Sequence, residues 1–107
     1  MRVVDYIVKY IEDQGMTQEE AAAVVGCSRQ NLWDKLNRGS SRFHNMLPII
    51  TAFGFELHIV HEDGSPAGFD EDKFIAAVSR ARNMYIDDLE NIIIAMGYRF
   101  NLVRKAE

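Results

Sequence analysis

The positions of apolar and polar residues predict a run of short helices at the start of the chain. Apolar residues recur every three or four positions from residue 3 to residue 13, which is the period of an amphipathic helix. The capping box formed by Thr17 and Glu20, and the serine at position 28, each mark the start of a further helix. The three predicted helices cover residues 3–13, 18–25 and 29–37.

The apolar period then changes from that of a helix to that of a strand. Helical spacing over residues 46–53 predicts a fourth helix, in which Pro48 is tolerated only within the first turn. Gly54 ends this helix. Apolar and polar residues alternate over residues 55–61, which is the period of a strand with one buried face.

A turn-rich segment, residues 62–69, leads into a second part with two more helical patterns and an alternating segment over 98–104. We therefore expect a mainly α fold with a small β-sheet. A four-helix helix-turn-helix unit with its strand would occupy residues 1–61, and a helix-helix-strand extension would occupy residues 70–107.

The two parts of the chain are similar to each other. An offset of 43 residues places 42–60 on 85–103, with identical residues at five positions, including the pair Gly54 and Gly97. This similarity favours a helix–glycine–strand unit used twice, although any amphipathic helix followed by glycine and a strand would align in a similar way. In either case, the strands 55–61 and 98–104 can pair, within one chain or between two chains.

Charge and cysteine content narrow the classes of function. The 107-residue chain has a net charge of −4, which argues against simple polyanion binding, but residues 29–42 hold four cations and predict a local basic patch. The single cysteine, Cys27, excludes an intramolecular disulfide and a thiolate metal cluster, and it fits a reducing cytoplasm. The apolar runs are too short to span a bilayer, so we expect no membrane association.

Three residues have the spacing that two helices joined by a tight turn require. Ala22 is small enough for close packing, Gly26 suits the left-handed backbone of the turn, and Leu32 locks the crossing of the helices. This arrangement pushes the second helix outward, toward the major groove of DNA.

With this motif and the run Gln30–Gly39, residues 3–60 resemble the lambda-repressor/Cro-like (XRE-type) helix-turn-helix family. The resemblance implies a bacterial or phage-encoded, dimeric DNA-binding regulator without a cofactor. It implies that the third helix reads base edges and that flanking residues hold phosphates without reading sequence. The base-reading candidates are Arg29, Gln30, Trp33 and Asp34. The phosphate-binding candidates are Gln18, Asn31, Asn37, Arg38, Ser40, Ser41 and Arg42.

Two of these candidates depart from the family pattern. Trp33 is a large apolar group where the family usually has a small polar one, and it would either touch thymine methyl groups or pack against the protein. Asp34 would repel phosphates unless it accepts a hydrogen bond from cytosine. No nucleophile elbow, Gly-rich phosphate loop, pair of catalytic carboxylates or metal-ligand spacing is apparent in the sequence, so we expect neither an enzyme nor a metal site.

The expected function is that of a repressor that binds a palindromic operator in double-stranded DNA as a homodimer, with residues 70–107 as the dimerisation element. The alternative is a protein-interaction module of helix-turn-helix shape. Such a module would be an antitoxin or a phage-encoded inhibitor, and it would bind a protein partner through residues 70–107.

Overall fold

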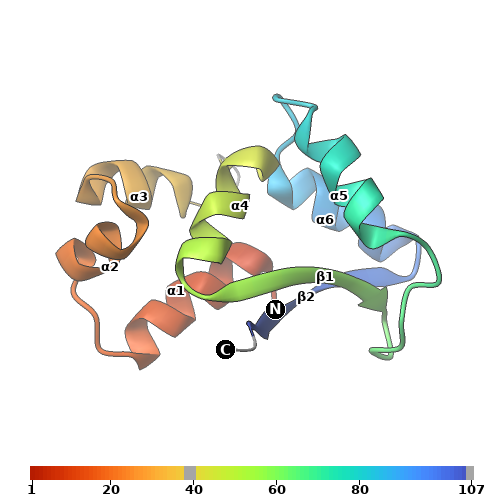
Figure 1. Ribbon diagram of the computed structural model, residues 1–107, viewed down its shortest axis with the longest axis horizontal. Coiled ribbons are helices and arrows are strands. Elements are labelled where there is room, and N and C mark those ends of the chain that lie inside the picture. Colours follow the sequence, from red (N-terminus) through yellow and green to blue (C-terminus); the bar gives the residue numbers. More distant parts are fainter. Residues whose placement is uncertain (38–40, 106–107) are drawn as a thin grey trace.

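The computed structural model describes residues 1–37 and 41–105, which form six helices and a two-stranded antiparallel sheet (Figure 1). The expectation of a mainly α fold with a small sheet is confirmed. The elements in chain order are α1 (Val3–Asp13), α2 (Gln18–Val25), α3 (Arg29–Lys35), α4 (Phe43–Ala52), β1 (Phe55–His61), α5 (Glu71–Ser79), α6 (Ile86–Ala95) and β2 (Tyr98–Arg104).

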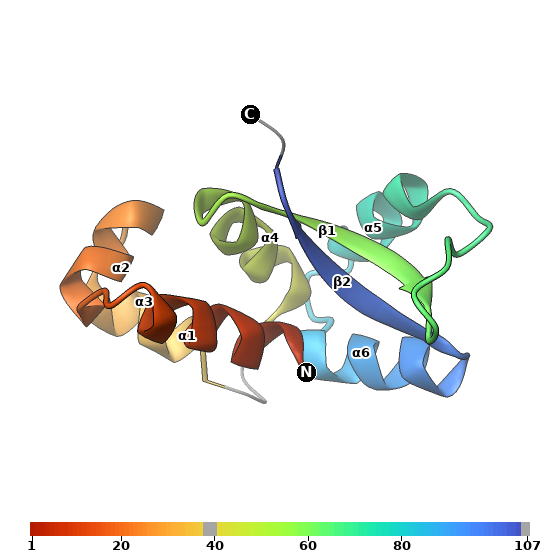
Figure 2. The same cartoon turned by 90° about the horizontal axis from the view of Figure 1, so that it is seen from below.

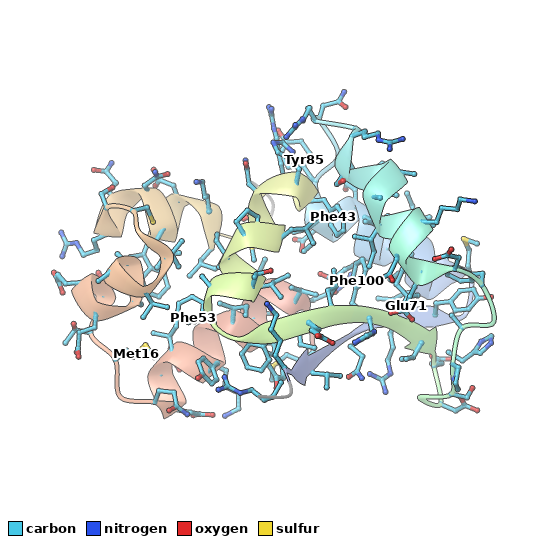
Figure 3. The ribbon with its side chains drawn as sticks, in the orientation of Figure 1. Met16, Phe43, Phe53, Glu71, Tyr85 and Phe100 are labelled. Carbon is cyan, nitrogen blue, oxygen red and sulfur yellow. The ribbon has the colours of Figure 1, made fainter. Side chains whose placement is uncertain are left out.

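The helices α2 and α3 lie at one end of the long axis, and α5 and α6 lie toward the other end, where the two strands run alongside them (Figures 1 and 2). One continuous apolar core joins both parts, because it includes side chains of α1 to α4, both strands and α6. Near its centre, Phe43 of α4 stacks on Phe100 of β2, with ring centroids 5.9 Å apart (Figure 3). Residues 1–61 therefore share their core with the second part.

The strands β1 and β2 pair within one chain, which answers the question that the sequence left open. Phe55 lies opposite Arg104, and His61 lies opposite Tyr98. At the middle of the ladder, His58 faces Asn101, the residue 43 positions later in the sequence. If each residue of β1 is replaced by the residue 43 positions later, and each residue of β2 by the residue 43 positions earlier, the same set of pairs results. A helix–glycine–strand unit used twice requires this symmetry.

The hydrogen bonds at the starts of α4 and α6 are related by the same 43-residue offset. The amide of Phe43 donates to the carbonyl of Met84 (2.8 Å), and the amide of Ile86 donates to the carbonyl of Ser41 (2.9 Å). Neither helix has a side-chain cap, so each uses the backbone that precedes the other helix. These two bonds fix the helix starts side by side at an internal pseudo-two-fold axis.

A buried carboxylate ties the second part to the start of α1. Glu90 of α6 is 3% exposed, and both of its carboxylate oxygens lie 3.3 Å from the amide nitrogen of Val3, which donates to them. A negative charge at this position complements the helix dipole and replaces the missing side-chain cap of α1.

Three details differ from the sequence predictions. The helix α3 ends at Lys35, and α4 begins at Phe43, so Pro48 lies inside α4 rather than in its first turn. The helical spacing of Leu89, Ile92, Ile93 and Met96 predicts that all four lie on the core face, but Ile92 and Met96 are 48% and 65% exposed. The core face of α6 is formed instead by Ile86, Leu89 and Ile93. Within the described residues, every helix falls short of the length and apolar content that crossing a bilayer requires.

Candidate nucleic-acid interface

The helices α2 and α3 form a compact pair around a left-handed glycine. The capping box of α2 is confirmed, with reciprocal hydrogen bonds between Thr17 and Glu20. Gly26 ends α2 with φ +87°, a conformation that residues with a Cβ rarely adopt, and its amide donates to the carbonyl of Ala22 (2.9 Å). Ala22 and Leu32 are 3% and 0% exposed, so they hold the two helices together as the motif requires.

The outer side of α3 is polar and open. Ser28 caps the helix by accepting from the amide of Asn31 (3.1 Å), and Leu32 turns inward. Gln30, Asn31 and Asp34 are exposed and share the side opposite Leu32, because residues three and four positions apart lie on one face of a helix. This face carries two amides that can pair with adenine and one carboxylate that can accept from cytosine.

Arg29 lies at the start of α3, where it meets α2. Its guanidinium Nη1 is 3.5 Å from Oε1 of Glu19, and the two side chains are 59% and 70% exposed. An exposed ion pair of this kind contributes at most about 1 kcal/mol, so Arg29 can exchange Glu19 for another acceptor at little cost. Glu19 holds this base-reading candidate beside the exposed face.

Of the two positions considered for Trp33, contact with thymine or packing against the protein, the structure favours packing. Its ring is half buried and contacts the core, beside a hollow lined by Asp5, Val8, Lys9 and Glu12 of α1. The indole Nε1 is buried without a hydrogen-bond partner. Trp33 therefore packs part of its ring between α3 and α1, which favours the packing alternative over contact with thymine methyl groups.

The phosphate-binding candidates divide into three groups. Arg38 and Ser40 lie outside the described residues. Gln18, Asn31, Asn37 and Arg42 are exposed around α2, α3 and the start of α4. The prediction that Ser41 binds phosphate is wrong, because this residue is only 2% exposed and its hydroxyl donates to the carbonyl of Asn37 (3.5 Å). Its own carbonyl accepts from Ile86, so Ser41 joins the two halves and offers no hydrogen bond to a phosphate.

Two arginines that the sequence analysis did not select lie beside Arg42. The guanidinium of Arg42 donates to the carbonyl of Arg82 (3.5 Å) and stands over the ring of Tyr85, 5.7 Å from its centroid. Arg80 and Arg82 line one shallow hollow with His44 of α4. We call Arg42, Arg80 and Arg82 the arginine corner. The signal that points to it is the 43-residue offset, which places 80–84 on the predicted phosphate-binding segment 37–41.

The arginine corner has an excess of positive charge. The ion pairs between described residues involve other cations, namely Lys9, Arg29 and His58. Partial burial, followed by the charges of Arg82 and Arg42, lowers the pKa of His44 from its ordinary value of 6.5. His44 is therefore neutral at pH 7, and the charge at this place comes from the arginines.

Residues 1–37 and 41–105 contain no group of three His, Cys, Asp or Glu side chains arranged to hold a metal ion. Comparison with protein-family models, with curated proteins and with solved structures gave no match.

Proposed function

We propose that this protein is a sequence-specific DNA-binding transcriptional regulator, most simply a repressor that blocks a promoter in the cytoplasm of a bacterium or an infected bacterial cell. The observation that carries the proposal is the pairing of α2 and α3 around Gly26, with a polar, open face on α3. A helix in this position can enter the major groove, where Gln30 and Arg29 can each form two hydrogen bonds to one base.

Binding to a palindromic operator requires two copies of α3, and the pairing of the strands limits which surface could join two chains. The β1–β2 ladder is closed within one chain, so a homodimer on a palindromic operator would use a different surface. Ile92 of α6 and Met96, the residue that follows this helix, are exposed apolar side chains four positions apart, and they are the surface that we propose for such a dimer. A single chain, in contrast, would read one half-site.

Selection of binding sites from randomised duplex DNA at about 150 mM salt tests the proposal. Loss of one good base contact costs about 1–3 kcal/mol, or roughly 5- to 150-fold in affinity. We therefore expect wild-type protein to enrich a sequence that Arg29→Ala/Gln30→Ala fails to enrich. Lys73→Gln/Lys105→Gln, which changes two exposed cations away from α3, should enrich the same sequence as the wild type. An enriched palindrome supports the dimer, and an enriched single half-site supports the monomer.

The second candidate is the protein-interaction module, and the charge of the exposed face favours it. Asp34 lies in the middle of the face that would approach phosphates, and Glu19 lies beside Arg29. Val24 of α2, which is 46% exposed, adds an apolar contact nearby. If the selection enriches no sequence, the regulator proposal is wrong, and this acidic and apolar surface becomes the candidate site for a protein partner.

A further inference from the structure

The arginine corner occupies the place of a second phosphate-binding segment. The segment 37–42, which follows α3, is the one for which the family resemblance implies phosphate contacts. Its counterpart at the 43-residue offset is 80–85, which follows α5 and contains Arg80 and Arg82. The amide of Phe43, just after the first segment, donates to Met84 in the second, and the amide of Ile86, just after the second segment, donates to Ser41 in the first. The two segments therefore end side by side.

The corner lies on the same side of the molecule as α3. In Figure 1, α3, the start of α4 and the connection between α5 and α6 follow the upper side, and the two strands lie below them. Figure 3 shows Tyr85, the residue under Arg42, on this upper side. The longest dimension of the molecule is 39 Å, which is close to one turn of B-DNA, about 34 Å. One duplex can therefore contact α3 and the corner together.

The chemistry of the corner suits a phosphate diester. Arginine guanidinium groups bind phosphate through parallel N–H···O bonds, and Arg80 and Arg82 are exposed. No carboxylate among the described residues forms an ion pair with the three arginines, so their charge is available to an external anion. The acidic balance of the second part would repel DNA elsewhere, which confines the contact to this place.

We infer that the arginine corner binds backbone phosphates of the same duplex whose bases α3 reads, so that the second part of the chain anchors the DNA beside the half-site. This inference rests on the proposed function. It gives the second part a role in DNA binding through the phosphate backbone alone, because the exposed residues of its helix α5, namely Asp72, Lys73, Ala76 and Ala77, carry no amide side chain like those of α3.

The test measures how salt affects the affinity of the full-length chain for a fluorescein-labelled, mixed-sequence 20-base-pair duplex. Each lost phosphate contact reduces the slope of log K against log salt by about 0.9. We expect Arg80→Gln/Arg82→Gln to reduce the slope by up to about 1.8 and to weaken binding equally on any sequence. Between 50 and 200 mM salt, this change alters the affinity ratio of wild type to variant by roughly tenfold.

Two further variants identify the source of the effect. Arg80→Lys/Arg82→Lys keeps both charges and should keep most of the slope, and Lys73→Gln/Lys105→Gln should leave the slope unchanged. Circular dichroism should show the same fold for all variants, because the side chains are exposed. An unchanged slope for Arg80→Gln/Arg82→Gln overturns this inference and leaves the proposed function intact. A wild-type chain that binds no duplex at all, or that shows no sequence preference in the selection, overturns both.

Discussion

A disulfide across the middle of the ladder would show whether the strands pair within one chain in solution. His58 and Asn101 lie opposite each other, and opposite residues of an antiparallel pair have Cβ atoms about 4.5–5.5 Å apart. The corresponding Cα separations fall within the range that a disulfide accepts, about 4.4–6.8 Å. The perturbation is therefore His58→Cys/Asn101→Cys in a Cys27→Ser background, which removes the competing thiol.

The length of chain between the two positions sets the expected gain in stability. An intrachain bridge between residues 58 and 101 closes a loop of 43 residues, and the loss of unfolded-state entropy for such a loop stabilises the fold by about 4 kcal/mol. This is an upper value, because strain at the bridge subtracts from it. Urea titration of the oxidised and reduced forms of the same variant measures the difference, and the loss of the His58 side chain cancels between the two forms.

The product of oxidation decides the connectivity. At low micromolar concentration, we expect a single-chain species on a non-reducing gel, with a midpoint of urea unfolding that falls on reduction. A covalent dimer as the main product would mean that β1 pairs with β2 of a second chain, and an unreacted pair of thiols would mean that this register is wrong. The single-cysteine variants, each in the same background, control for dimers formed by collision.

Substitutions at three other residues test contacts that stabilise the fold. A hydrogen bond to Glu71 raises the pKa of His58 above its ordinary value of 6.5, so the stabilisation is present below that pH and is lost as pH rises through the folded-state pKa. Glu71→Gln should flatten the dependence of the urea midpoint on pH between about 6 and 8, and a variant with the wild-type dependence would contradict this assignment. Glu90→Ala should lower the free energy of unfolding by about 2–3 kcal/mol, because the amide of Val3 loses a charged acceptor, and a loss below about 0.5 kcal/mol in urea titration would refute it. Trp33→Ala should cost about 2 kcal/mol through lost packing, whereas Trp33→Phe, which removes a buried N–H without a partner, should cost less than about 1 kcal/mol. Equal losses for the two Trp33 variants, measured in the same way, would argue against the packing role.

Local chemistry made most of the helix starts predictable. Thr17, Ser28 and Asp70 each accept a hydrogen bond from an amide three residues later, and such caps are visible in the sequence. The start of α4 was placed too late because its first amide bonds to Met84, which is far away in the sequence. A backbone carbonyl can come from any residue type, so a cap of this kind cannot be recognised from the sequence.

Burial at the candidate interface was less predictable, because it depends on how the halves meet. Ser41 has the composition of an exposed turn, but its carbonyl is used by α6 and its side chain is covered. Trp33 lies between buried Leu32 and exposed Asp34 in α3, and the presence of α1 beside it covers part of the ring. Ile92 and Met96 have helical spacing like that of core residues, since α6 is apolar on two sides and spacing alone does not select the inner one.

The closed ladder also determines how the protein responds to dilution. If two separate chains each supplied one helix–glycine–strand unit, the pair would dissociate as the concentration fell below its dissociation constant. Here, residues 62–97, which include α5 and α6, connect the two strands, and a connection within one chain holds its ends at an effective concentration on the order of millimolar. The pairing of β1 with β2 is therefore as complete at nanomolar protein as at micromolar protein. The shape of the surface around α3 and the arginine corner does not depend on how many copies of the chain are present.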